Sequence, residues 1–234
     1  MLRILVSSAL LAATAIACGG VSSPLGAAAA QDRVDEVRRL LAAGESPDQL
    51  GPGGTTPLID AVQTNALAAA AALLDAGADP NRRDATAAGW TPLMYAIHHG
   101  HAAAVQLLLN RGADPNARGK SGGLPLLAAA TQSDPAFVSL LMAHGASARG
   151  DGHDGADVLT AAVTGVSFDD TDPPPLVIAH VGFQIASGGC HRETVHALLA
   201  HDPGLRLGDL LRRFRGAHTI VRWKCDDLLA LVDR

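Results

Sequence analysis

Aromatic residues are scarce in this chain. They make up 3% of its 234 residues, although 48% of the residues are hydrophobic. Any core therefore has to be built from Ala, Leu and Val. Because residues that favour strands are sparse beside Ala and Leu, this composition suits closely packed helices better than sheets. The length allows one sizeable domain or a one-dimensional array of repeats.

Several classes of function find no support in the sequence. The formal net charge is −5, whereas domains that bind nucleic acid usually carry a basic surface. No apolar run reaches the roughly 20 residues that cross a bilayer. The chain also contains no phosphate-binding loop and no C-x-x-C pair. We therefore expect a non-enzyme without cofactor or metal, and no nucleic-acid partner.

The first residues differ from the rest of the chain. Met1-Leu2-Arg3 gives a short positive start, residues 4–17 are apolar or small without a charge, and Cys18 follows. This is the order of regions in a secretory signal. Residues 15–18, Ala-Ile-Ala-Cys, resemble a bacterial lipobox, in which the Cys is lipidated and becomes the new N-terminus. An ordinary signal peptidase would instead cut after Ala30. The start of the chain thus predicts export to the periplasm, with membrane attachment only through a lipid on Cys18. A frayed N-terminal helix of a cytosolic protein is the alternative.

Three cysteines are present, and Cys190 and Cys225 remain if Cys18 is lipidated or removed. An even pair in an exported chain predicts a disulfide. By the loop-entropy rule such a bond contributes roughly 3–4 kcal/mol. Two separate, small buried thiols are the alternative.

A repeat with one period runs through most of the chain. Four segments end with apolar residues, two spacers and a glycine, at Gly44, Gly77, Gly112 and Gly145, and the glycines are 33, 35 and 33 residues apart. Thr56-Pro57-Leu58 and Thr91-Pro92-Leu93 keep the same phase. These residues resemble the ankyrin repeat, whose period is 33 and whose signature is T-P-L-H-x-A. The resemblance implies an all-α repeat solenoid with short β-hairpin fingers between helix pairs.

Local chemistry agrees with this periodicity. Thr56 and Thr91 are suited to cap the first helix of a pair, and the following proline fits its first turn. The four repeated glycines suit the left-handed residue that ends the second helix. The 35-residue spacing places two extra residues in the second finger, between Arg82 and Ala88. Insertions in solenoids map to loops, often on the binding face.

The repeats divide the chain into three parts. We expect a signal peptide or lipoprotein signal with linker at 1–26, an ankyrin-repeat domain of about five repeats at 27–205, and a C-terminal helical cap at 206–234. The acidic, Pro-rich stretch near 166–190 is predicted to be an insertion in the fifth repeat, and a sixth repeat is the alternative. The basic residues of the cap suit a solvated end of the array, or else a basic docking patch.

The resemblance also implies where a partner binds, because ankyrin partners contact variable positions of the fingers and first helices. Carrying those positions over gives a set of candidates: Gln49, Thr55, Gln63, Arg82, Arg83, Trp90, Tyr95, His98, His99, Arg118, Lys120, Thr131, Gln132 and His153. Trp90 and Tyr95 are the strongest candidates for contact with a partner, since interface hot spots favour Trp, Tyr and Arg. Packing between adjacent fingers is the alternative role for Trp90. The basic fingers predict an acidic patch on the partner. His98, His99 and His101 suit surface or structural roles better than a metal site.

We therefore expect a monomeric interaction module in the bacterial cell envelope that binds one protein through finger tips and the concave face. It resembles periplasmic ankyrin proteins that act as immunity partners of secreted toxins or that support stress enzymes such as catalase. A secreted effector is the alternative within the binding class. An enzyme with its site in residues 167–190 is the alternative outside it.

Overall fold

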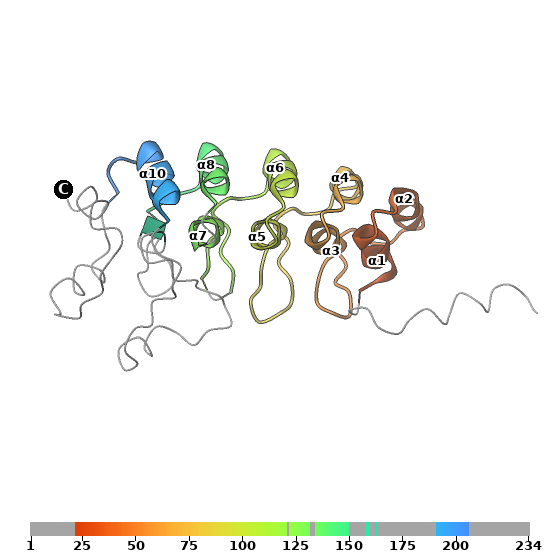
Figure 1. Ribbon diagram of the computed structural model, residues 1–234. Coiled ribbons are helices and arrows are strands. Elements are labelled where there is room, and N and C mark those ends of the chain that lie inside the picture. Colours follow the sequence, from red (N-terminus) through yellow and green to blue (C-terminus); the bar gives the residue numbers. More distant parts are fainter. Residues whose placement is uncertain are drawn as a thin grey trace, which may run out of the picture.

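Helices follow one another in pairs along the chain. The computed structural model describes residues 22–120, 122–131, 134–149, 158, 159, 162 and 191–205. Within these ranges no residue lies in a strand, and the helices form two parallel rows (Figure 1). The inner row holds α1 (Pro24–Ala30), α3 (Pro57–Gln63), α5 (Pro92–His98) and α7 (Pro125–Thr131). The outer row holds α2 (Val34–Ala42), α4 (Leu67–Asp75), α6 (Ala102–Asn110), α8 (Pro135–Ala143) and α10 (Arg192–His201). The predicted all-α repeat solenoid is confirmed.

Each inner helix begins at a hydroxyl cap followed by proline. The Thr56 hydroxyl accepts the N–H of Ile59 at 3.2 Å, and the Thr91 hydroxyl accepts that of Met94 at 3.4 Å. Ser23 does the same for α1, at 3.0 Å from the Gly26 nitrogen. Ser-Pro-Leu at 23–25 thus replaces Thr-Pro-Leu. Helix α1 spans the predicted boundary between residues 26 and 27.

The first four outer helices end at glycines in the left-handed region, as the sequence predicts. Gly44, Gly77, Gly112 and Gly145 have φ angles of 95°, 89°, 87° and 88°. In this region a Cβ is strained and glycine is not. The same stop recurs in the first four repeats, so their fingers leave the outer helices in the same direction, whereas α10 ends at Asp202 in an extended conformation.

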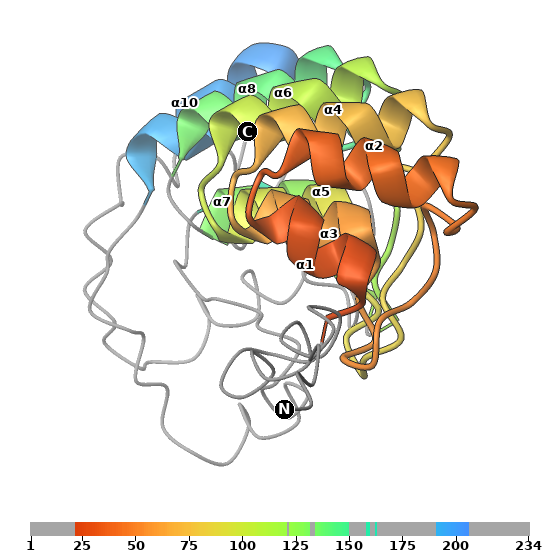
Figure 2. The same ribbon diagram turned by 90° about the vertical axis from the view of Figure 1, so that its right-hand side faces the viewer.

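The core lies between the two rows, which Figure 2 shows nearly end-on as two stacked layers. One alanine per repeat is fully buried at the same position of the inner helix: Ala28, Ala61, Ala96, Ala129 and Ala162. One leucine per repeat is at most 1% exposed, three residues before it: Leu25, Leu58, Leu93, Leu126 and Leu159. The small side chains let neighbouring helices approach closely while the leucines fill the space between repeats.

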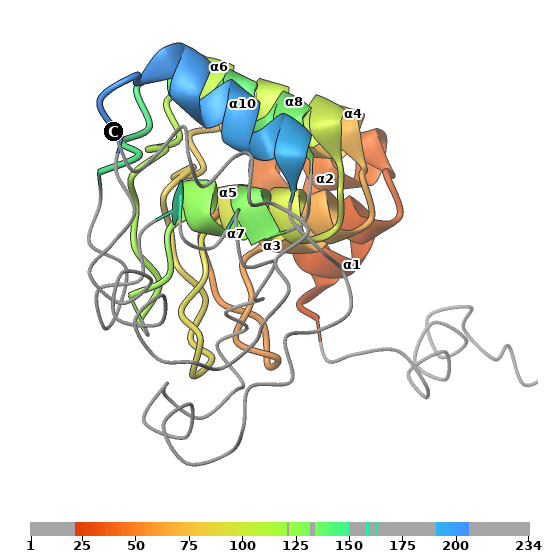
Figure 3. The same cartoon turned by 60° about the vertical axis from the view of Figure 1, so that its left-hand side comes forward.

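A backbone hydrogen bond connects the inner and outer helices of the fifth repeat. The His191 N–H donates to the Ala162 carbonyl at 3.1 Å, as the His101 N–H does to Ala96 at 2.9 Å. Donor and acceptor are 29 residues apart in the first pair and five in the second, so 24 residues are extra. Helix α10 packs beside α8 (Figure 3). This arrangement favours one fifth repeat with an insertion over a sixth repeat. Residues 163–190 and 206–234, with Cys190 and Cys225, lie outside the described residues, as does Cys18.

The fingers are hairpin-like turns joined edge to edge. The Asp84 N–H donates to the Trp90 carbonyl at 3.0 Å and closes the second finger. Its Ala85 N–H donates to Gly54 of the first finger, and its Ala88 carbonyl accepts the N–H of Lys120 in the third, both at 2.8 Å. The two-residue lengthening therefore falls where the second finger bonds to both neighbours.

No helix in the described ranges is long and apolar enough to span a bilayer.

Candidate protein-interaction surface

Five rings from the second finger, α5 and the start of α6 lie in contact. The Trp90 ring centroid lies 5.3 Å from Tyr95 and 5.1 Å from His98. His99 lies 5.2 Å from His98, 6.5 Å from Tyr95 and 5.7 Å from His101. We call these five residues the ring cluster. Residues 95, 98 and 99 share one face of α5 because they are spaced by three and four positions.

The members of the ring cluster differ in exposure. His98 and His99 are exposed, whereas Trp90, Tyr95 and His101 are half-buried. The His101 Nε2 lies 3.1 Å from the Gln63 carbonyl, and since a carbonyl only accepts, this nitrogen carries the proton. His101 therefore ties the second repeat to the third. The exposed rings available to a partner are those of His98 and His99, with half-buried Trp90 and Tyr95 at their base.

A buried aspartate, Asp84, holds Tyr95 in place. It is 3% exposed, and its carboxylate accepts the Thr86 N–H at 2.9 Å, the Thr86 hydroxyl at 2.7 Å and the Tyr95 hydroxyl at 2.7 Å. Burial and the Asp84 carboxylate raise the pKa of Tyr95 well above its usual value. Tyr95 is therefore a neutral donor whose position is fixed by the second finger.

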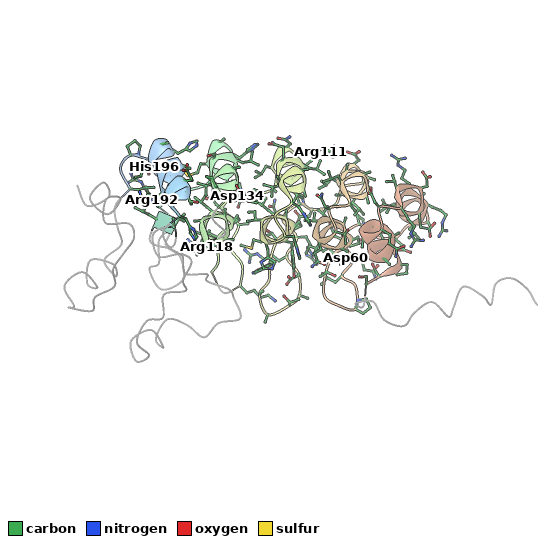
Figure 4. All side chains as sticks on the ribbon, in the orientation of Figure 1. Asp60, Arg111, Arg118, Asp134, Arg192 and His196 are labelled. Atoms are coloured by element: carbon green, nitrogen blue, oxygen red, sulfur yellow. The ribbon has the colours of Figure 1, made fainter. Side chains whose placement is uncertain are left out.

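A second buried aspartate, Asp60, lies on α3 of the neighbouring repeat (Figure 4). It is 5% exposed, and its Oδ1 accepts the Thr55 hydroxyl at 2.7 Å. Its Oδ2 lies against Gly26, where a Cβ would clash, and makes no hydrogen bond within the described part of the chain. Burial raises the pKa of Asp60, opposed by the Thr55 hydroxyl and, more weakly, by the nearby side chain of Ser22.

The four cations predicted to contact a partner fall into two groups. Arg82 and Arg83 are exposed and make no side-chain ion pair with any described residue. Lys120 instead donates from Nζ to the Thr86 carbonyl at 2.7 Å, and its stem covers Gly89. Arg118 is half-buried and donates to Gly122 at 3.5 Å (Figure 4). Two of these cations are thus available to a partner, while Lys120 and Arg118 support the fingers.

The remaining candidates are spread more widely. Gln49 is exposed at the first finger, and Thr55 and Gln63 are half-buried. Gln132, His153 and the side chain of Thr131 lie outside the described residues. The sequence alone did not identify the buried acceptors Asp84 and Asp60, or the supporting role of Lys120. The role of Asp84 could have been found from the Asp84-x-Thr86 spacing, which is typical of a turn stabilised by a side chain.

Catalytic and metal-binding arrangements find no support in the described part of the chain. No three of its His, Cys, Asp and Glu residues are grouped to hold a metal ion. Residues 119–123 match the letters G-x-S-x-G. The described residues of this segment, 119, 120, 122 and 123, lie in the third finger, where the Gly119 N–H donates to the Gly123 carbonyl at 2.9 Å. A nucleophile elbow instead needs a strand before it and a helix directly after it.

Comparison with known families agrees with this geometry. Residues 9–84 and 25–119 match the family model described as ankyrin repeats in three copies. The helix pairs continue in register beyond residue 119, through α7, α8 and α10. A search of curated proteins finds no significant match. The family match and the repeated helix pairs together show that the chain belongs to the ankyrin-repeat family.

Proposed function

We propose that this protein binds one protein partner through its second finger and the exposed face of α5, without catalysing a reaction. Ankyrin repeats are generally protein–protein interaction modules, and the family is typically non-enzymatic. The observation that carries the proposal is the ring cluster, in which exposed His98 and His99 adjoin half-buried Trp90 and Tyr95. Interface hot spots are enriched in Trp, Tyr and Arg.

The rigidity of this surface supports the proposal. Asp84 fixes Tyr95, and the fingers bond to one another through Ala85 and Ala88. A surface that is already ordered loses less conformational freedom when a partner docks, so more of the contact energy appears as affinity. Exposed cations next to such a surface then set orientation and the rate of encounter.

The charge of the surface favours a partner with an acidic patch. Arg82 and Arg83 are exposed, whereas the nearby carboxylates of Asp60 and Asp84 are buried and hydrogen-bonded within the fold. The second finger therefore presents positive charge although the whole chain carries −5. Complementary potentials of this kind increase association rates and exclude partners of like charge.

A pair of charge reversals tests this proposal. Arg82→Glu with Arg83→Glu should abolish capture of the partner from the envelope fraction of the native cells, with no fall in melting temperature. Arg33→Glu with Arg38→Glu is the matched control, because both residues are exposed at α2, away from the fingers. Lys120 and Arg118 are unsuitable for this test, since their contacts support the fingers. Unchanged capture by the Arg82/Arg83 variant would contradict the proposed surface.

We also propose that the protein is exported and that processing occurs before Ser22. A cut after Ala30 would remove α1, whose Leu25, Ala28 and Ala29 are at most 1% exposed in the core. A cut at Cys18 keeps all of α1, and this supports the lipobox over the later site. Intact-mass analysis of the envelope-purified protein tests the proposal. A diacylglycerol-modified N-terminal Cys18 is expected, and a mature chain beginning at Gln31 would overturn it.

A further inference from the structure

We propose that His98 and His99 form a proton-dependent subsite for the carboxylate side chains of an acidic segment in the partner. This inference rests on the proposed function, since it names the chemistry that the α5 face recognises. It adds that the imidazoles, and not only Arg82 and Arg83, hold the acidic segment. Binding should therefore strengthen as the medium becomes more acidic.

The imidazole nitrogens of the pair are the contact points for a carboxylate. The ring of His99 is nearly parallel to those of Tyr95 and His101, with interplanar angles of 12° and 17°. The ring nitrogens of His99 are the atoms that can donate a hydrogen bond to a carboxylate, and they lie in the plane of its ring. His98 meets His99 edge-on at 82°, with its centroid 5.2 Å away. Both residues are exposed, so one carboxylate can reach a nitrogen of each.

Within the described residues, no exposed acid lies on the helices that pack against α5. In the described residues, α6 and α7 carry no ionisable side chain. Helix α3 carries only Asp60, which is buried against Thr55 and Gly26. The second finger carries Asp84, which is buried on Tyr95, and Arg82 and Arg83, which are cationic.

One further carboxylate precedes the second finger. Asp79 accepts the N–H of Asn81 and lies next to the end of α4 rather than among the rings. Among the described residues, a protonated His98–His99 pair therefore has no carboxylate left to pair with, and we assign that role to the partner.

The sign of the pH effect follows from the environment of His99. Burial, His98 and His101 lower the pKa of His99, so without a ligand the charged form is disfavoured near neutral pH. A carboxylate from the partner would favour the charged form and raise this pKa in the complex. Linkage then requires that affinity increase as pH falls, with up to one extra proton bound for each imidazole that contacts the carboxylate.

A labelled peptide tests the subsite directly. We expect a rhodamine-labelled hexa-aspartate peptide to bind the full chain at least about fivefold more tightly at pH 5.5 than at pH 7.5, the size of one exposed ion pair. Fluorescence anisotropy measures both affinities, and a hexa-serine peptide is the neutral control. His98→Gln with His99→Gln should remove the pH dependence while Arg82 and Arg83 retain residual binding. His144→Gln with His196→Gln, at two exposed histidines on the outer helices, should leave it unchanged.

The possible outcomes separate this inference from the proposed function. A hexa-aspartate affinity that does not change with pH, or a pH dependence that survives in the His98/His99 variant, overturns the subsite. Stronger binding of a hexa-lysine peptide would also overturn it, since this shows the opposite charge preference. The proposed function stands or fails separately, on whether the Arg82/Arg83 variant loses the protein partner at pH 7.5. Melting temperatures at both pH values confirm that the variants are folded when they are compared.

Discussion

Removal of the Asp84 carboxylate should destabilise the repeat array far more than its position in a finger suggests. Asp84→Ala deletes the acceptor of three hydrogen bonds of 2.7–2.9 Å, two from Thr86 and one from Tyr95. A hydrogen bond to a charged group contributes about 1.5–3 kcal/mol, and neighbouring bonds do not add fully. Because Tyr95 is half-buried, water can replace part of what is lost. We therefore expect the free energy of unfolding to fall by about 2–4 kcal/mol.

Equilibrium urea denaturation at pH 7, followed by far-ultraviolet circular dichroism, measures this loss. The matched control is Asp48→Ala, because Asp48 accepts a single exposed bond from the Asp79 N–H at 3.0 Å, and removing it should cost about 1 kcal/mol or less. A second readout is the absorbance of the phenolate. Without Asp84 the pKa of Tyr95 should fall toward its usual value, although burial still holds it above. Equal losses in the two variants, with an unchanged Tyr95 titration, would refute the role assigned to Asp84.

Three further perturbations test the core, a buried charge and a helix end. Leu108→Ala, at a fully buried side chain of α6, should lower the free energy of unfolding by about 3–5 kcal/mol in urea denaturation, and a loss below about 1 kcal/mol would contradict the packing described. Because the folded-state pKa of Asp60 is raised, its contribution to stability is complete below its unfolded pKa and is lost as pH rises through its folded pKa. Melting temperature should therefore fall as pH rises above the ordinary pKa of an Asp, and Asp60→Asn should flatten this dependence; an unchanged slope would show that another group is responsible. Gly112→Ala meets no atom within 4 Å but places a Cβ at φ +87°, so calorimetry should show a loss of about 1–2 kcal/mol from backbone strain alone, and no loss would contradict that conformation.

The fold could be predicted because its determinants recur once per repeat. Thr56 and Thr91 cap inner helices, and Gly44 and Gly112 end outer ones, by local chemistry that needs no knowledge of distant contacts. The first inner helix is harder to recognise, since Ser23 stands where the signature has threonine. Its alanine-rich sequence also resembles the end of an export signal.

The candidate site could be predicted only in part, because its organisation depends on contacts between repeats. Trp90 and Tyr95 were recognisable as variable positions occupied by large aromatic residues. Nothing in the sequence reveals that Lys120 reaches across to the Thr86 carbonyl, or that His101 holds Gln63. These contacts join residues 34 and 38 positions apart, so only the register between neighbouring repeats creates them.

Site-specific photo-crosslinking tests most directly the central claim that one protein docks on the second finger and α5. A benzoylphenylalanine introduced at Arg83, which is exposed on the second finger, is compared with one at Gln106, which is exposed on α6 in the outer row. Irradiation of the native envelope fraction should yield one covalent adduct with the Arg83 variant and none with the Gln106 variant. An adduct formed from position 106 and not from position 83 would contradict the account.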